Sequence, residues 1–136
     1  MGRSNPLDTY VGIPYIKGES GGSGCDCWGL VVMVYRDLLG VELPLYQDYR
    51  TSAADVEAVA NLVAGAPDSW HEISGSEATY LDLVIIRAAG IESHVGLLAG
   101  SGMILHTTPQ VGRSVSERAS SIRLSRRISR YARYCH

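Results

Sequence analysis

The chain has 136 residues, of which 46% are hydrophobic and 19% charged, and this is the composition of an ordinary globular protein. Its length predicts one domain over residues 1–136, long enough to fold around its own core. No apolar run approaches the ~20 residues of a membrane-spanning helix, so we expect no membrane span. The N-terminus lacks the apolar stretch of a secretory signal peptide, so we expect no such signal.

The net charge of −2 conceals a basic C-terminal segment, residues 113–136. This segment holds seven arginines and one acid, Glu117, whereas the rest of the chain is acidic. An arginine-rich surface either docks on an acidic partner or is simply solvated, and the sequence leaves both open. We expect no nucleic-acid partner, because the chain carries no zinc finger, phosphate-binding glycine loop or basic platform with interleaved aromatic residues.

The first predicted helix runs from Cys27 to Leu39 and follows a glycine-rich loop. Asp26 is a suitable N-cap, and Gly40 is a suitable residue to end the helix. Gly29 lowers the helix propensity of the first turn, and its presence predicts close packing of that turn against another segment. One apolar face of the helix contains Leu30, Val31, Val34 and Leu38.

A second helix is predicted from residue 52 or 53 to residue 64, and short strands separated by glycine-bearing turns follow Pro67. The predicted strands are Trp70–Ile73, Asp82–Arg87, Ser93–Ala99, Met103–Thr107, Val111–Val115 and Arg126–Tyr134. Residues 100–102 join two of them as a hairpin loop. Helices followed by antiparallel strands indicate an α+β fold with a sheet of about five or six strands.

The three cysteines, Cys25, Cys27 and Cys135, do not form a disulfide framework. Cys27 stands in the first turn of the predicted helix, where unpaired backbone N–H groups and the positive end of the helix dipole favour an anion. Such a position raises the thiolate fraction and suits a nucleophile. The alternative for any free cysteine is a small buried hydrophobic residue.

Two histidines lie on the adjacent strands that the hairpin loop joins. His94 and His106 both stand at odd offsets from Ser101, so both side chains can emerge from one face of the sheet, near but not directly opposite each other. A thiol, an imidazole and a second polar group form the arrangement of nucleophile, base and orienting residue that activates a cysteine. We expect the cysteine helix to cover the histidine face, with three apolar residues packing on the other: Val95, Leu97 and Ile104.

A metal-binding module is an alternative to an enzyme. Its four soft ligands would be Cys25, Cys27, His94 and His106. The cysteine pair has one intervening residue at a helix start, which is a poor chelate, so we expect no metal. We assign no role to His71 and His136, because neither has an evident partner.

Residues 25–44, Cys-Asp-Cys-Trp-Gly-Leu-Val-Val-Met-Val-Tyr-Arg-Asp-Leu-Leu-Gly-Val-Glu-Leu-Pro, resemble the nucleophile helix of the NlpC/p-sixty family of cell-wall cysteine peptidases. The stretch His94-Val-Gly, followed by a glycine turn and Met-Ile-Leu-His106, is similar to the histidine strands of that family. Tyr15-Ile-Lys-Gly18 resembles the Tyr-x-x-Gly motif upstream of the family's cysteine. The resemblance spans about residues 14–107 in the family's order.

This resemblance implies a papain-like α+β core, in which an N-terminal nucleophile helix packs on an antiparallel sheet, and no cofactor. It implies three catalytic residues: Cys27 as the nucleophile, His94 as the base and His106 as the residue that orients the base. Three residues close to the cysteine would support the substrate or the oxyanion: Tyr15, Asp26 and Trp28. The family's typical substrate is the γ-D-glutamyl–diaminopimelate bond of peptidoglycan stem peptides.

Trp28 stands where the family usually has serine, and Cys-Asp-Cys-Trp-Gly-Leu resembles the variant of tail-associated members from bacteriophages and gene transfer particles. This resemblance implies a component of a virion tail or phage-like particle, docked on a larger tail hub or tail-tip protein and acting in the host periplasm. We expect the basic segment to make the docking contact. A non-catalytic tail protein that keeps the peptidase fold is the alternative.

Overall fold

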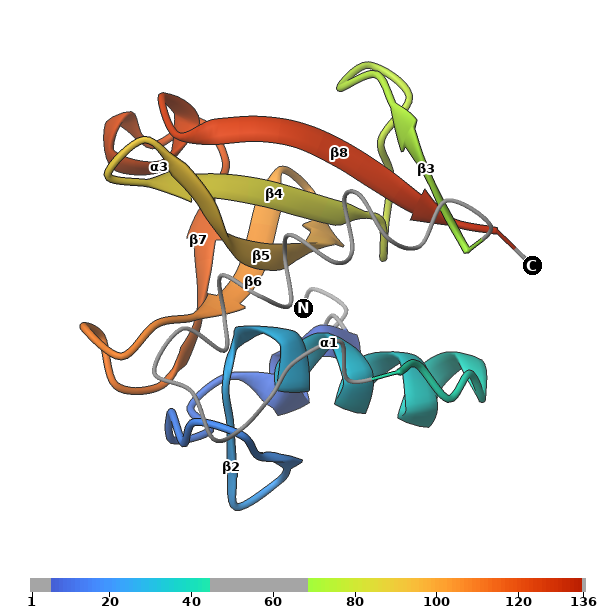
Figure 1. Cartoon of the computed structure of the whole chain (residues 1–136), viewed down its shortest axis with the longest axis vertical. Helices are drawn as coiled ribbons and strands as arrows, with labels where there is room; N and C mark the ends of the chain where they lie inside the picture. Colours follow the sequence, from blue (N-terminus) through green and yellow to red (C-terminus); the bar gives the residue numbers. More distant parts are fainter. Residues whose placement is uncertain (1–5, 45–68, 136) are drawn as a thin grey trace, which may run out of the picture.

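The computed structural model describes residues 6–44 and 69–135. In the view of Figure 1, an N-terminal part with helix α1 (Cys27–Val34) lies below an antiparallel sheet made from the second half of the chain. This is the α+β arrangement that the sequence predicts. The second predicted helix, residues 52–64, lies outside the described residues. None of the helices in the described ranges has the length and apolar character that crossing a membrane requires.

Helix α1 begins directly after its N-cap, Asp26, whose Oδ1 accepts a hydrogen bond from the Gly29 amide at 2.7 Å. All eight residues of α1 are buried, so the helix is apolar on every side and not along a single stripe. The backbone then continues as a π-helical turn, η2 (Tyr35–Leu39), and ends at Gly40 with φ at 66°. Leu38 is exposed, so its predicted place on the apolar face is wrong, because the wider π turn leaves the α-helical register.

The segment before α1 ties the start of this helix to the sheet. It contains the 3₁₀ helix η1 (Pro6–Tyr10) and two short paired strands, β1 (Ser20–Gly21) and β2 (Gly24–Cys25). Tyr15 forms a bridge with Cys25, and the Tyr15 amide donates a hydrogen bond to the Gly112 carbonyl at 2.9 Å. The start of α1 therefore lies next to the loop that follows strand β6 (Met103–Thr107).

Within the described ranges, six antiparallel strands form the main sheet, in the order β3-β8-β4-β5-β6-β7. Besides β6, they are β3 (Trp70–Ile73), β4 (Leu83–Ala88), β5 (Ile91–Gly100), β7 (Ser114–Arg118) and β8 (Ile128–Tyr134). The last strand along the chain, β8, pairs with β3 on one side and with β4 on the other. The prediction of five or six strands built from residues after Pro67 is confirmed.

Four strands differ in their bounds from the prediction: β4 and β5 by one or two residues, and β7 and β8 for reasons that the structure shows. The strand expected at Val111–Val115 begins only at Ser114, because residues 108–112 form a turn in which the Gly112 amide bonds to the Thr108 carbonyl at 2.9 Å. The strand expected from Arg126 begins at β8 (Ile128–Tyr134), because a short helix, α3 (Ile122–Ser125), precedes it. Both shifts come from tight turns that the apolar pattern does not reveal.

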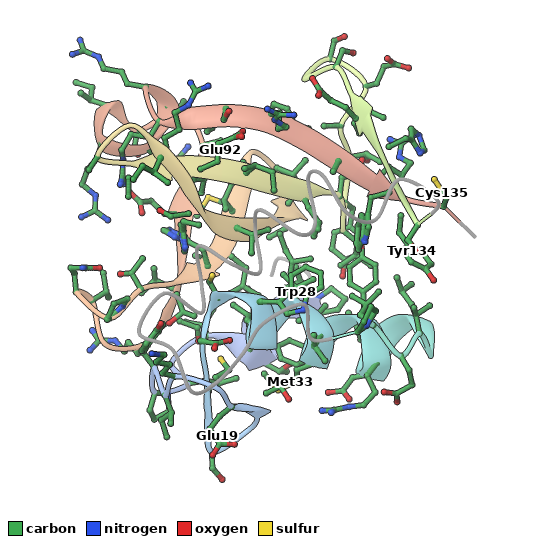
Figure 2. The ribbon with its side chains drawn as sticks, viewed as in Figure 1. Glu19, Trp28, Met33, Glu92, Tyr134 and Cys135 are labelled. Carbon is green, nitrogen blue, oxygen red and sulfur yellow. The ribbon has the colours of Figure 1, made fainter. Side chains whose placement is uncertain are left out.

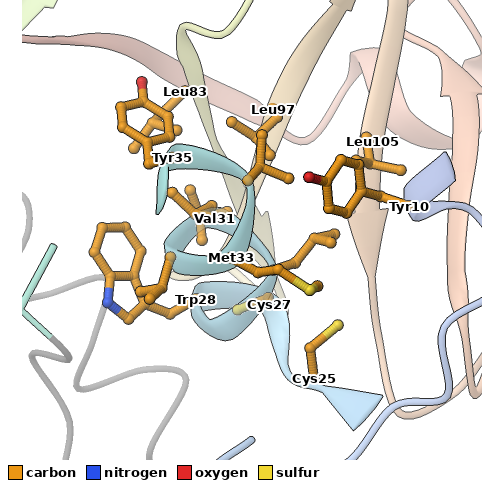
Figure 3. Close-up of a cluster of buried hydrophobic side chains, with 14 of the residues drawn as sticks. Tyr10, Cys25, Cys27, Trp28, Val31, Met33, Tyr35, Leu83, Leu97 and Leu105 are labelled. Carbon is orange, nitrogen blue, oxygen red and sulfur yellow. The ribbon is translucent and has the colours of Figure 1, made fainter. Parts of the chain in front are cut away.

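Alternate residues of β4 face two hydrophobic clusters on opposite sides of the sheet. The larger cluster packs α1 against β4, β5 and β6, and Figure 3 shows residues of α1 among Leu83, Leu97 and Leu105. The smaller cluster contains Val84, Ile86, Ile104 and Leu124. Val95 and Leu97 therefore pack toward α1, and the prediction that they pack away from it is wrong, because a helix buried on every side needs the apolar face of β5.

Candidate active site

Cys27 is the first residue of α1 and is fully buried (Figure 3). Helix α1 packs against β5 and β6, the strands that carry His94 and His106. The bridge between Tyr15 and Cys25, two residues before Cys27, and the hydrogen bond from the Tyr15 amide to the Gly112 carbonyl hold the start of α1 close to the loop that follows β6. The first helical turn favours an anion at Cys27, as the sequence predicts.

Hydrogen bonds hold the glycine-rich loop against the first turn of α1. The Asp26 amide donates to the Glu19 carbonyl at 3.2 Å, and Asp26 Oδ2 accepts a hydrogen bond from the Gly18 amide at 2.8 Å. A Cβ atom at Gly29 would lie 2.0 Å from the Glu19 carbonyl oxygen, so only glycine fits there. The close packing predicted from Gly29 is confirmed.

The two histidines contact each other and continue into a chain of polar side chains. His94 Nε2 lies 2.8 Å from His106 Nδ1 in a buried contact between β5 and β6. His106 Nε2 lies 3.0 Å from Glu117 Oε1 on β7, and Arg123 Nη2 donates to the same oxygen at 3.1 Å. We call these four residues the histidine relay. The histidines share one face, as predicted, and it is the face of Ile86, which opposes His94 in the β4–β5 register and belongs to the smaller cluster. The expectation that the cysteine helix covers the histidine face is wrong, because the body of α1 packs on the opposite face, with Val95 and Leu97. Only the start of α1 lies close to the loop that follows β6.

The relay sets the position of each proton. The Arg123 guanidinium holds the pKa of the Glu117 carboxyl below its ordinary value, so Glu117 is ionised and only accepts hydrogen bonds. His106 Nε2 must then carry the proton that it donates to Glu117, which leaves His106 Nδ1 as an acceptor. His94 Nε2–H therefore donates to His106, and neutral His94 keeps its lone pair on Nδ1. His94 is thus prepared as a base at Nδ1.

Both histidines are held in the neutral state. Burial, followed by the neighbouring His106 and Arg127, lowers the pKa of His94 to about 3. Burial also lowers the pKa of His106, against the opposing effect of its hydrogen bond to Glu117. At neutral pH His94 therefore has a free lone pair with which to take a proton.

Sequence reasoning missed Glu117 as a site residue. Its signal in the sequence is that it is the single acid among the arginines of residues 113–136. The strand expected at Val111–Val115 ends before Glu117, and this boundary hides the contact. In the structure β7 extends to Arg118 and pairs with β6, which brings Glu117 within reach of His106.

The three residues expected to support the substrate or oxyanion differ in their surroundings. Tyr15 is half-buried beside Cys25, close to the start of α1. Both carboxylate oxygens of Asp26 accept backbone N–H groups, so Asp26 organises the first turn. Trp28 is fully buried: its Nε1 donates to the Pro44 carbonyl at 2.9 Å, and its ring packs edge-on against Trp70. This position gives Trp28 a packing role, and its support of the substrate or oxyanion stays a prediction.

The two other cysteines lie in different environments from Cys27. Burial and the adjacent Asp26 raise the pKa of Cys25 to about 12, so Cys25 remains a thiol. Cys135 lies beyond β8 and apart from α1 (Figure 2), with its Sγ 2.8 Å from His71 Nδ1. The expectation that His71 has no partner is wrong, because β3 pairs with β8 and brings His71 and Cys135 together.

Across residues 6–44 and 69–135, no three His, Cys, Asp or Glu side chains gather as a metal ion would require.

A model of the NlpC/P60 family matches residues 12–130. The chain therefore belongs to the NlpC/P60 family, and the family resemblance of residues 14–107 is confirmed. The match includes α1 and the strands that carry the histidine relay.

Known proteins share this fold and part of this sequence. The chain is 27% identical to the murein DD-endopeptidase MepS/murein LD-carboxypeptidase of Escherichia coli (strain K12) over 117 residues, which cover 84% of this chain and 54% of that protein. It is 30% identical to the gamma-DL-glutamyl hydrolase of Bacillus subtilis (strain 168) over 102 residues, which cover 74% of this chain and 21% of the hydrolase. This chain thus spans about half the length of MepS and a fifth of the hydrolase.

A solved structure shows the same architecture. A protein of Staphylococcus aureus, described as similar to lipoprotein and of the NLP/P60 family, superposes with a TM-score of 0.66 at 25% sequence identity. The superposition covers 96% of this chain and 39% of that one. The α1-and-sheet core is therefore shared with a longer protein of the same family.

Proposed function

We propose that this protein is a cysteine endopeptidase that hydrolyses peptidoglycan stem peptides, with Cys27 as nucleophile, His94 as base and His106 as orienting residue. The observation that carries the proposal is the histidine relay, which leaves the lone pair of neutral His94 on Nδ1. Family membership supports the reaction class. The names of the two relatives, a murein endopeptidase and a gamma-DL-glutamyl hydrolase, support the substrate class.

In the proposed reaction, the Cys27 proton passes to His94 Nδ1 as the sulfur attacks the carbonyl carbon of the scissile amide. The imidazolium that forms is stabilised through His106 by the Glu117 carboxylate. His94 then gives the proton to the leaving nitrogen, and the C–N bond breaks to leave a thioester on Cys27. Water, deprotonated by His94, hydrolyses the thioester and restores the thiol.

The negative oxygen of the tetrahedral intermediate needs hydrogen-bond donors. We assign this role to backbone amides at the start of α1, helped by the helix dipole and by the hydroxyl of Tyr15. Asp26 supports the assignment, because its hydrogen bonds to Gly18 and Gly29 hold the first turn in place. Removal of one oxyanion donor typically lowers the rate by ~10²–10³.

For the bond that is cut, we propose the γ-D-glutamyl–diaminopimelate amide. The name of the Bacillus subtilis relative supports this bond, whereas the name of MepS points to a different one, so a direct measurement is needed. Purified peptidoglycan is digested with the protein, and the soluble fragments are identified by mass spectrometry. The proposal predicts fragments that end in D-glutamate and partner fragments with a newly exposed diaminopimelate amine. Fragments cut at another peptide bond would revise the bond but keep the enzyme class, whereas release of no fragments would favour a non-catalytic role.

We also propose that the protein is part of a virion tail or phage-like particle, docked on a larger tail hub or tail-tip protein, and acts in the host periplasm. The resemblance of residues 25–30 to tail-associated members supports this location. Among the described residues, three exposed arginines of the basic segment have no acidic partner and suit a docking contact: Arg113, Arg118 and Arg126. Mass spectrometry of purified particles tests the location, and particles that lack this chain would reject it.

A further inference from the structure

A cavity of about 210 Å³ opens beside His94. Its lining comes from the ends of β4 and β5, from the loop after β6 and from the residue before β8. Neither α1 nor any described residue before it contributes to this lining. In the proposed reaction, His94 delivers a proton to the leaving nitrogen, so a cavity on the side of His94 suits the leaving-group half of the peptide.

Among the described residues, Arg127 is the one cationic side chain that lines this cavity, and both its backbone amide and its carbonyl are hydrogen-bonded. The Arg127 amide donates to the Leu124 carbonyl at 2.9 Å, and the Arg127 carbonyl accepts from the Arg87 amide at 2.8 Å. The side chain is held at its base, because Nε donates to the Arg123 carbonyl at 2.9 Å. The Nε contact orients the guanidinium and leaves its two terminal nitrogens to bind a ligand.

The charge of Arg127 contrasts with that of its neighbours. Arg123, Arg130 and Arg133 each form an ion pair with a carboxylate. Among the described residues, no carboxylate pairs with Arg127, although it is half-buried. The nearest acid of the relay, Glu117, is already bound by Arg123 and His106. A half-buried guanidinium that no carboxylate pairs with can bind an anionic group of a ligand.

We propose that this cavity is a carboxylate-binding subsite, in which Arg127 binds a free carboxylate on the leaving-group side of the scissile amide. The subsite rests on the proposed function and deepens it. Diaminopimelate fits this chemistry, because its side chain carries a free carboxylate on the same residue as the amine that leaves. The planar guanidinium can bind a carboxylate through two parallel hydrogen bonds, and this geometry explains the use of arginine.

The test uses two synthetic stem peptides that differ at one group, a free carboxylate or a neutral amide on the diaminopimelate residue. The wild-type protein should cleave the carboxylate peptide with a kcat/KM that is higher by about tenfold or more. Arg127→Gln should lose this preference by slowing only the carboxylate peptide. Arg127→Lys should retain part of the preference for the carboxylate peptide, because lysine keeps the positive charge but cannot form two parallel hydrogen bonds to a carboxylate.

Arg126→Gln is the matched control, since Arg126 is the exposed neighbour of Arg127 and does not line the cavity. This variant should keep the full preference of the wild type. Equal cleavage of both peptides by the wild type would overturn the subsite and leave the proposed function intact, whereas cleavage of neither peptide would count against the proposed function itself. An Arg127→Gln variant that slows both peptides equally would show a structural role and would also overturn the subsite.

Discussion

Glu117 decides which nitrogen of His94 is protonated, although of the two histidines it contacts only His106. Glu117→Gln keeps the size of the side chain, but an amide both donates and accepts hydrogen bonds, so His106 loses its fixed tautomer. We expect kcat/KM to fall by ~10- to 100-fold, which is typical when a residue that orients a reactive side chain through a hydrogen bond is lost. Nitrogen NMR shifts of His94 should change from a single tautomer to a mixture.

The neighbouring residue supplies the control for this substitution. Arg118→Gln changes an exposed side chain at the end of the same strand and should leave both the rate and the His94 tautomer unchanged. If Glu117→Gln keeps the wild-type rate and the wild-type nitrogen shifts, Glu117 does not position the base.

The low pKa of His94 makes stability depend on pH. Because folding lowers this pKa from 6.5 to about 3, the unfolded chain binds a proton in that window that the folded protein does not. Stability should therefore fall as the pH drops from about 6.5 toward 3, by up to ~1.4 kcal/mol per pH unit for this one group. Urea unfolding between pH 7 and 4 measures the effect. His94→Gln should show a shallower decline, and an equal slope in both proteins would contradict the burial argument.

The residues with local signals could be predicted from the sequence. Cys27 is marked by its place after an N-cap, and His94 and His106 by their odd offsets from the hairpin centre. Glu117 could not be assigned, because its contact depends on the β6–β7 register, which the turn at residues 108–112 sets. The same limit applies to Arg127, whose cavity is built from segments distant in sequence.

At the level of elements, Gly29 controls how α1 meets the loop before it. In Gly29→Ala the new Cβ would meet the Glu19 carbonyl, a backbone atom that cannot rotate away. We expect a loss of ~1–3 kcal/mol in the free energy of unfolding, together with reduced activity, because the start of α1 shifts. Gly22→Ala is the control, since a Cβ there meets no atom within 4 Å. Denaturant unfolding of both variants checks the prediction, and equal stabilities would show that the contact is not limiting.

The positions of most helices and strands could be predicted from the hydrophobic pattern and the capping residues, but the type of helical turn could not. The helix start at Cys27 follows from Asp26, and the strand Met103–Thr107 has its predicted bounds. The π turn at Tyr35–Leu39 leaves no mark in the apolar periodicity, so the exposure of Leu38 was not foreseeable. The helix expected over residues 52–64 lies outside the described residues and stays a prediction.

At the level of the whole molecule, the α+β class follows from helices that precede strands, whereas the strand order does not. Strand β8 enters between β3 and β4, and this pairing joins segments more than 40 residues apart along the chain. Ion pairs of β8 support the insertion, since Arg130 binds Glu92 and Arg133 binds Asp82. Part of the basic segment thus stabilises the sheet, a use that its charge alone does not reveal. The prediction that Val95 and Leu97 face away from α1 was wrong for a similar reason. Which face of the sheet α1 covers depends on its tertiary packing, and the alternation of residues along a strand does not reveal it.

The central claim is that Cys27 is the nucleophile of a peptidoglycan endopeptidase. The most direct measurement compares the release of soluble peptides from purified peptidoglycan by the wild type, Cys27→Ala and Cys25→Ser. Cys27→Ala should abolish release while the protein stays folded, whereas Cys25→Ser should remain active, because burial keeps Cys25 a thiol with its pKa raised to about 12. Full release by Cys27→Ala, or loss of release in folded Cys25→Ser with Cys27 intact, would contradict the account.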